Sequence, residues 1–237
     1  FDVLIWVPTM SVGNNFFETV CFLAANPFSF NSKYLQERIH KLDEFELGKR
    51  FLLDSDPIMR DLIKSHEIDK MPTRKDNLGG LVQIIINQQL SNKAAATIFN
   101  RFKSLFTGQI TSRKILALSE PNFAAAGISR PKASYIHALA ERLAAEPKFL
   151  QKVRAADDQS ATKLMTSIKG IGPWSAQIFL MFNLGRLDIF PIGDLILNRA
   201  IRTLYEAQPG EEASVAERWT PYRSIASMHL WRWKDDS

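Results

Sequence analysis

One aspartate and a pair of glycines upstream of it have residue types and a spacing that favour chemistry. Asp194 stands 22 residues after Gly172 (194 minus 172), between the loop 188–193 and a helical pattern. That position places its carboxylate at a helix N-terminus, where it can cap the helix, take part in catalysis, or do both. A carboxylate held against developing positive charge stabilises the transition state of a bond cleavage.

The glycine pair belongs to a turn between two helical patterns, in the stretch 167–174, which reads Ser-Ile-Lys-Gly-Ile-Gly-Pro-Trp. Glycines permit positive φ and a close approach of the backbone to a ligand, and proline suits the first position of a new helix. Such a turn directs N–H groups outward, where a phosphate is the natural partner. A plain helix connection with glycines at the corner is the alternative. The turn predicts a phosphate grip made of Lys169, Gly170, Ile171 and Gly172.

The elements that must hold these residues are helices throughout. Apolar residues recur at helical spacing in nearly every segment, with only a β-like cluster in the first dozen residues, so we expect an all-α fold. Residues 81–86 are apolar nearly all round and predict a buried central helix, and Ser91 predicts the N-cap of the next helix. Further helices are expected at 32–46, 57–66, 112–118, 131–145, 161–169, 174–184, 195–206, 211–219 and 222–233.

Composition excludes several classes of site. The single cysteine, Cys21, excludes an internal disulfide framework and a four-cysteine iron-sulfur cluster, and the four histidines lack metal-ligand spacing. No side-chain metal site is therefore expected. Residues 81–237 carry 20 basic and 13 acidic side chains, an excess of +7 (20 minus 13) that favours a polyanionic partner, although a solvated basic surface has the same signature.

Taken together in order, the motifs resemble a known family. Gly-Ile-Gly-Pro-Trp-Ser-Ala, a helix, Asp-Ile-Phe-Pro and then Asp194 are similar to the helix-hairpin-helix (HhH-GPD) DNA glycosylases, within them the 3-methyladenine DNA glycosylase II branch. Segments 84–91, 126–133 and 217–224 agree with that branch, and the likeness covers residues 31–233. The family often has an acidic residue before the aspartate, where this chain has Gly193. The resemblance implies a two-lobed helical fold with the active site in the cleft between the lobes.

By this resemblance Asp194 is the catalytic residue, and Trp174 and Tyr222 form an aromatic pocket. A ring face attracts a purine made cationic by alkylation. Gln89, with Leu90 and Ser91 beside it, is the expected wedge that fills the gap left by a flipped nucleotide. Each has a plain alternative: the aromatics as core residues, Gln89 as a polar helix end.

The implied reaction is hydrolysis of the N-glycosidic bond of an alkylated base in double-stranded DNA, which leaves an abasic site. Bifunctional relatives have a lysine at the position of Trp174, so we expect no lyase activity. No cofactor is required, and a monovalent cation on hairpin backbone carbonyls is the one addition that the resemblance allows. The alternatives are a non-catalytic DNA-binding module, favoured if Asp194 is buried or turned away from the hairpin, and a glycosylase for a neutral lesion. A metal-dependent nuclease would need clustered carboxylates, and Asp188, read as a loop-capping residue, does not supply them.

For organisation, we expect an N-terminal extension of undefined role at residues 1–30 and one helical glycosylase domain at 31–237, with the hairpin at 161–184. No apolar run reaches membrane-spanning length, so no membrane partner is expected. The expected state is a monomer inside the cell with the DNA, in the cytoplasm or nucleoid of a bacterium or the nucleus of a eukaryote.

Overall fold

The computed structural model describes residues 32–74 and 77–236, with side chains described for residues 44–74 and 77–235. The expected extension at residues 1–30, with its β-like start, lies outside this part. The chain divides into two compact units, residues 1–41 and 42–237. In the first unit, the described residues 32–41 are helical. The second unit holds the other described residues, 42–74 and 77–236.

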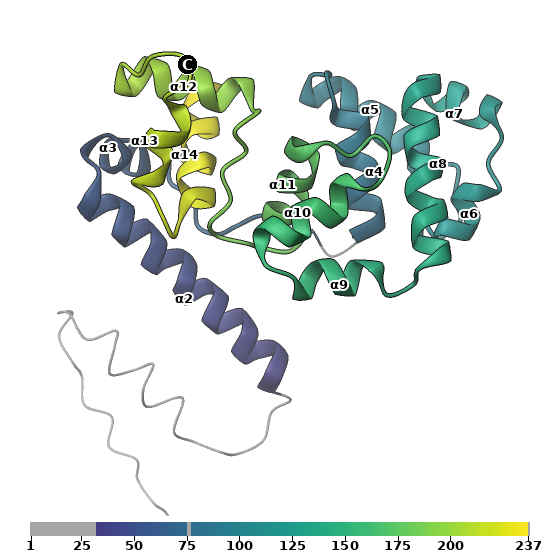
Figure 1. Ribbon diagram of the computed structural model, residues 1–237, viewed down its shortest axis with the longest axis horizontal. Coiled ribbons are helices and arrows are strands. Elements are labelled where there is room, and N and C mark those ends of the chain that lie inside the picture. The colour runs from purple at the N-terminus through teal and green to yellow at the C-terminus, as the bar shows by residue number, and fades with distance from the viewer. Residues whose placement is uncertain (1–31, 75–76, 237) are drawn as a thin grey trace, which may run out of the picture. The chain divides into compact units, whose positions relative to one another are not determined.

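All the regular structure in the described part is helical, which confirms the all-α prediction (Figure 1). None of the helices found there is long and apolar enough to cross a membrane. The helices are α2 (Ser32–Ser55), α3 (Pro57–Ser65), α4 (Asn77–Asn87), α5 (Asn92–Lys103), α6 (Ser112–Leu116), α7 (Glu120–Ala126), α8 (Arg130–Ala145), α9 (Phe149–Ala155), α10 (Asp158–Thr166), α11 (Pro173–Phe182), α12 (Leu195–Tyr205), α13 (Glu212–Glu217) and α14 (Arg223–Asp236).

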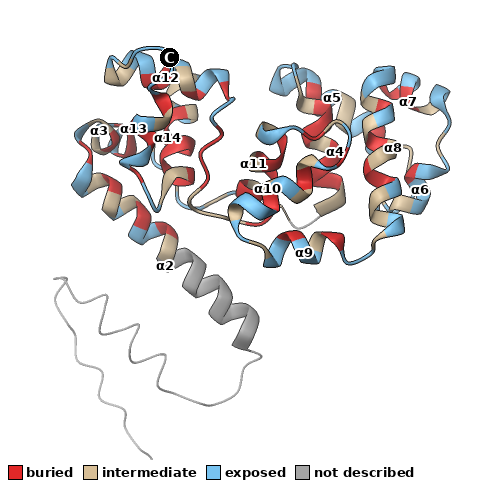
Figure 2. Cartoon of the chain, in the orientation of Figure 1, coloured by how far each residue is buried: buried red, intermediate tan, exposed pale blue. Residues whose placement is uncertain are grey.

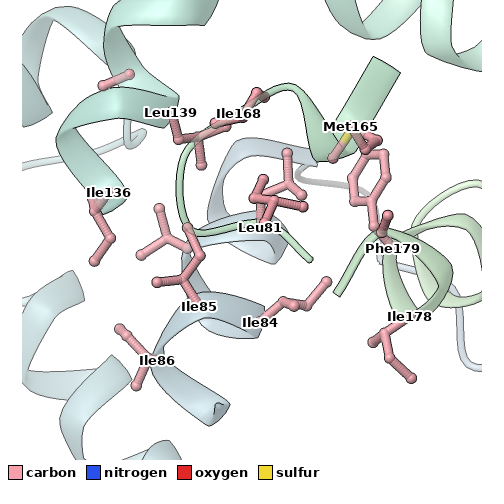
Figure 3. Packing of buried hydrophobic residues seen from close by; sticks show 14 of the residues in the cluster. Leu81, Ile84, Ile85, Ile86, Ile136, Leu139, Met165, Ile168, Ile178 and Phe179 are labelled. Atoms are coloured by element: carbon pink, nitrogen blue, oxygen red, sulfur yellow. The ribbon is translucent and has the colours of Figure 1, made fainter. Parts of the chain in front are cut away.

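The first of two hydrophobic cores is built around α4, the predicted central helix. Its residues 79–82 and 84–86 are buried, as the red stretch of α4 in Figure 2 shows. Helices α5, α8 and α11 pack around it, and α10 packs against α11. Each helix buries an apolar face at about 1.5 to 3 kcal/mol per large side chain. Figure 3 labels the central members of this core, which are Leu81, Ile84, Ile85, Ile86, Ile136, Leu139, Met165, Ile168, Ile178 and Phe179.

The second core joins the two ends of the described chain. Residues from α2 and α3 pack against α12, α13 and α14, with the fully buried Trp219 among them. Phe182 of α11 and Trp231 of α14 pack against both cores. Parts of the chain far apart in sequence therefore meet where α11 and α14 approach each other.

Three helices differ from the sequence prediction. Helix α2 continues to Ser55 rather than ending near Glu46, because Gly48 lies inside it where α14 approaches closely. A Cβ at Gly48 would lie 2.4 Å from Ile225 and 2.6 Å from the Tyr222 ring, so the glycine serves packing and not termination. Helices α7 and α9, of seven residues each, were not predicted.

Candidate active site

The hairpin connects α10 to α11 and has the geometry that its glycines predicted. Gly170 adopts φ +87°, and a Cβ there would lie 2.1 Å from Cγ of Tyr135. Position 170 therefore requires glycine for two reasons: the backbone conformation is left-handed, and the Tyr135 ring occupies the space of a Cβ. Gly172 is the N-cap of α11, and a Cβ there would meet nothing within 4 Å. The backbone at Gly172 is therefore open to a ligand.

The other hairpin residues divide between core and surface. Ile171 is buried in the first core, whereas Lys169 is exposed and its Nζ lies 3.2 Å from the Ser134 hydroxyl. The side-chain amide of Gln88 donates to the Gly170 carbonyl at 2.9 Å and to the Ser175 hydroxyl at 3.0 Å. The end of α4 is therefore bound directly to the hairpin.

The predicted wedge lies in the turn that follows α4. Gln89 is exposed and has φ +59°, a left-handed conformation that is costly for a residue with a side chain. Leu90 is exposed as well, and Ser91 caps α5 as predicted, its hydroxyl accepting from the Ala94 N–H at 3.4 Å. The side chains of Gln89 and Leu90 therefore project outward from this turn, and the preceding residue, Gln88, is hydrogen-bonded to the hairpin.

A lysine from α8 stabilises the turn that follows α4. Lys132 Nζ donates to the carbonyls of Ile86 and Gln88, both at 2.7 Å. Burial lowers the pKa of Lys132, as desolvation does for any ammonium. Sequence reasoning did not single out Gln88 or Lys132, since their roles depend on partners more than 40 residues away.

Asp194 is the N-cap of α12 and is 8% exposed. Its Oδ1 accepts hydrogen bonds from the N–H groups of Ile196 at 3.0 Å and Leu197 at 2.9 Å. Its Oδ2 accepts from the indole Nε1 of Trp174 at 2.9 Å, and Oδ1 also accepts from Nε1 of Trp231 at 3.2 Å. The carboxylate therefore caps a helix and faces α11, the second helix of the hairpin, at the same time.

The surface next to this carboxylate is apolar. Ile192 is 57% exposed, Leu195 84% and Ile196 47%, and these three make up half of the six exposed large hydrophobic residues in the described part of the chain. Since Asp194 itself is nearly covered, the carboxylate lies just beneath an apolar rim.

The start of α14 fixes the loop that leads to Asp194. Arg223 forms a two-point ion pair with Asp188, with Nε to Oδ1 at 2.8 Å and Nη2 to Oδ2 at 3.0 Å, and this pairing raises the pKa of Arg223. The Ser224 hydroxyl accepts from the Ile189 N–H at 2.9 Å and donates to the Arg186 carbonyl at 2.8 Å. Asp188 thus has the structural role expected of it.

Tyr222, the other predicted pocket residue, packs elsewhere in the structure. Its ring centroid lies 5.6 Å from that of Phe51, on α2, where Gly48 makes room for it. Among the described residues, no hydrogen bond or ring contact joins Tyr222 to Trp174 or Asp194. Trp174 and Trp231 therefore both donate hydrogen bonds to the Asp194 carboxylate, whereas Tyr222 packs against Phe51.

A second aspartate has nearly the same surroundings as Asp194. Asp56 is the N-cap of α3, is 6% exposed, and accepts from the N–H groups of Ile58 and Met59. Its Oδ2 accepts from the Tyr205 hydroxyl at 2.9 Å and from Trp219 Nε1 at 3.0 Å. A buried N-cap aspartate with an indole donor therefore does not by itself identify a catalytic group. The two aspartates differ in that Asp194 is hydrogen-bonded to Trp174, on the second helix of the hairpin.

Comparison with known proteins decides the family. The model of the HhH-GPD superfamily of base excision DNA repair proteins matches residues 82–223, more than half of the chain, including the hairpin and Asp194. The chain belongs to the HhH-GPD superfamily. This HhH-GPD protein is 29% identical over 209 residues to the DNA-3-methyladenine glycosylase of Saccharomyces cerevisiae, covering 81% of this chain and 71% of that one.

Sequence and structure comparisons also relate this HhH-GPD protein to 3-methyladenine DNA glycosylase of Schizosaccharomyces pombe. DNA-3-methyladenine glycosylase 1 is 30% identical over 179 residues, covering 72% of this chain and 78% of its own length. A solved structure of a 3-methyladenine DNA glycosylase in complex with abasic DNA has a TM-score of 0.69 and 27% identity, covering 78% of this chain and 94% of that one. The resemblance inferred from the motifs is thereby confirmed.

The departure at Gly193 has no steric cause in this HhH-GPD protein. A Cβ at Gly193 would have only the Cβ of Trp174 near it, at 3.9 Å, which is ordinary contact. A Cβ would fit there, so contacts at the Cα do not require the glycine.

Proposed function

We propose that this chain is a monofunctional DNA glycosylase that removes alkylated purines from double-stranded DNA. The observation that carries the proposal is the hydrogen bond from Trp174 to Asp194. Because Trp174 lies on the second helix of the hairpin, this bond connects the proposed phosphate-binding turn to the carboxylate. The relatives named 3-methyladenine DNA glycosylases support the substrate class. We place the protein inside the cell with the DNA, acting as a monomer.

In the proposed mechanism the hairpin binds backbone phosphates through N–H groups near Gly172, and the turn at Gln89 enters the duplex as the nucleotide is extruded. The Trp174 ring face attracts the cationic base, and the apolar rim around Leu195 excludes water from it. Tyr222, just before α14, is proposed as a second pocket residue. Movement of this segment or of the substrate would bring the base to its ring.

The reaction breaks the bond between C1′ and the base nitrogen. The bonding pair goes to the cationic purine, which leaves as a neutral base, and the sugar develops positive charge that Asp194 stabilises. A water oxygen then bonds to C1′, and its proton passes to Asp194 or to solvent. No lysine stands at position 174, so no Schiff base forms and the abasic strand remains intact.

No group of three or more His, Cys, Asp and Glu side chains among the described residues is arranged to hold a metal. A monovalent cation on the hairpin carbonyls stays an optional part of the proposal. The carbonyl of Gly170 already accepts from Gln88, so a cation there would share that oxygen. No step of the mechanism passes through it.

Burial of Asp194 is the one observation that favours the alternative of a non-catalytic DNA-binding module, although its carboxylate points toward the hairpin helix and not away from it. The test is base release from heavily methylated duplex DNA by wild-type protein, Asp194→Asn and Asp56→Asn. Free bases, DNA affinity and strand breaks before and after alkali are measured for each.

We expect wild-type release with strand breaks only after alkali, and a loss on the order of a hundredfold or more in Asp194→Asn with DNA binding kept. Asp56→Asn is the matched control, because Asp56 is an equally buried cap with an indole donor. It should lower stability and keep most of the release per folded molecule. DNA binding without release by the wild type would support the module instead. Release from a parallel duplex that carries uracil or an oxidised base, with none from the methylated DNA, would support the neutral-lesion glycosylase.

A further inference from the structure

The turn that carries the proposed wedge begins where α4 ends. The last carbonyl groups of a helix have no partner within the helix and take donors from elsewhere. Here the chain closes a tight turn, in which the Leu90 N–H donates to the Asn87 carbonyl at 3.0 Å. The carbonyls of Ile86 and Gln88, on either side of Asn87, both accept from the Lys132 ammonium at 2.7 Å. A charged donor from another helix therefore closes the end of α4.

The backbone is strained at the residue that follows the Lys132 contacts. Gln89 has φ +59°, which a residue with a side chain adopts at a cost in free energy, so its conformation depends on the chain around it. Before Gln89, the two carbonyl contacts of Lys132 hold the chain, and after it Ser91 is fixed as the cap of α5. Lys132 and the start of α5 therefore set the direction in which Gln89 projects.

The N-terminal part of α8 also contacts the hairpin. The Tyr135 ring packs against Gly170, where a Cβ would come within 2.1 Å of it, and the Ser134 hydroxyl lies 3.2 Å from Nζ of Lys169. Lys132 precedes these residues on the same helix, which packs beside α4 (Figure 1). One helix therefore supports both the turn after α4 and the hairpin.

We propose that Lys132 is a positioning residue for base extrusion, holding the turn after α4 so that Gln89 enters the duplex at a fixed distance from the hairpin. This inference rests on the proposed glycosylase function and concerns the step before bond cleavage. Lys132 acts on the backbone of the turn and through it on Gln89. Its contribution is greatest where the lesion is paired and stacked, since extrusion then costs the most free energy.

A second lysine supplies a matched control. Lys114 of α6 donates from Nζ to the carbonyls of Thr107 at 2.7 Å and Gln109 at 3.1 Å, so it also closes a turn through two backbone contacts. That turn follows α5 and has no part in the proposed extrusion. Replacing either lysine by methionine keeps an unbranched apolar stem and removes the ammonium donor. An effect that comes merely from loosening a turn or losing one positive charge should appear in both variants.

The experiment measures single-turnover base release by wild type, Lys132→Met and Lys114→Met on two duplexes at saturating protein. Both carry one methylated purine, the base that the wild type releases fastest from methylated DNA. It stands opposite its normal partner in the paired duplex and opposite an abasic-site analogue in the unpaired duplex.

Lys132→Met should slow release from the paired duplex about tenfold, as loss of hydrogen bonds from a charged donor does. On the unpaired duplex the same variant should stay within about twofold of wild type, because less free energy is needed for extrusion. Lys114→Met should stay within about twofold of wild type on both duplexes.

A double variant tests whether Lys132 acts through the wedge. In a Gln89→Ala background, adding Lys132→Met should change release from the paired duplex by less than about twofold, because the side chain that Lys132 positions is already gone. A 2-aminopurine base next to the lesion reports extrusion by its fluorescence, independently of bond cleavage. Its rise should be about tenfold slower in Lys132→Met than in wild type.

Equal losses on the two duplexes would give Lys132 a merely structural role and overturn the proposal, as would a paired-duplex rate equal to that of wild type. A loss that is as large in the Gln89→Ala background would contradict it too, because Lys132 would then act by another route. If the wild type gave a fluorescence rise without base release, the glycosylase function would fail, and the fluorescence of Lys132→Met would still decide its role in extrusion. Absence of both signals in the wild type would overturn the function and this role together.

Discussion

The indole nitrogen of Trp174 lies 2.9 Å from Oδ2 of Asp194 and joins the helix that follows the hairpin to the cap of α12. These residues are 20 positions apart in sequence and come from helices whose buried faces belong to different cores. Correct placement of the carboxylate therefore depends on both cores being folded, which connects stability to activity in this protein.

The first prediction concerns the ring of Trp174. If its face attracts a cationic base, Trp174→Leu should release methylated purines about ten to thirty times more slowly than wild type, since a cation–π contact contributes up to about 2 kcal/mol. Trp174→Phe keeps an aromatic face and should lose less. The rates are measured by single turnover on methylated duplex DNA. Equal rates in the leucine and phenylalanine variants would rule out a role for the ring face.

The second prediction separates folding from DNA binding at the hairpin. Gly170→Ala places a Cβ against Tyr135 in a left-handed backbone conformation and should lower the free energy of unfolding by at least about 2 kcal/mol. Gly172→Ala meets open space and should change that free energy by less than about 0.5 kcal/mol. Its methyl group would instead face the bound phosphate and weaken DNA affinity.

Chemical denaturation and a DNA-binding titration measure the two effects of these hairpin variants. The pair is informative because each glycine controls for the other. Unchanged DNA affinity in Gly172→Ala would mean that the phosphate does not approach the backbone at this turn.

The third prediction sets stability against activity at Gln89. Its positive φ costs free energy that glycine would recover, so Gln89→Gly should raise the free energy of unfolding by about 0.5 to 1 kcal/mol. The same change removes the proposed wedge and should slow base release. Gln89→Asn is the control, since asparagine tolerates this conformation and keeps a shorter amide. Full base release by Gln89→Gly would exclude Gln89 as the wedge.

The fourth prediction is a pH dependence of stability. His229 is fully buried, and burial, with the positive charge of Lys49 second, lowers its pKa from 6.5 to about 4. The unfolded chain then binds a proton more readily than the folded chain as pH falls. This contribution to stability is complete above about pH 7, declines below pH 6.5 and is lost near pH 4, by about 3 kcal/mol in total.

Urea denaturation at several pH values measures this slope. His229→Gln should make the free energy of unfolding less dependent on pH between 6.5 and 4, whatever its absolute stability. Lys49→Met should reduce the dependence slightly, because the charge of Lys49 is one of the causes of the lowered pKa of His229 and burial, the largest cause, remains. A slope in His229→Gln as steep as in the wild type would assign the dependence to other groups.

Local patterns determined much of this protein from its sequence. The helical period of apolar residues indicated an all-α fold, the run 81–86 marked the buried helix, and Gly170, Pro173 and Asp194 marked a turn, a helix start and a cap. These features depend on residues close together in the chain, which is why sequence alone could predict them.

Long-range packing decided the rest. Gly48 does not end α2, since Tyr222, just before α14, and Ile225 of α14 approach its backbone. Nothing near Asp194 in sequence indicates Trp231, and nothing near Gly170 indicates Gln88, because these contacts join segments that only the two cores bring together. Asp56 and Asp194 are both buried N-caps that accept a hydrogen bond from an indole. Only the tertiary structure places one beside the hairpin and leaves the other inside the second core, since which side chains share a site depends on how the helices pack.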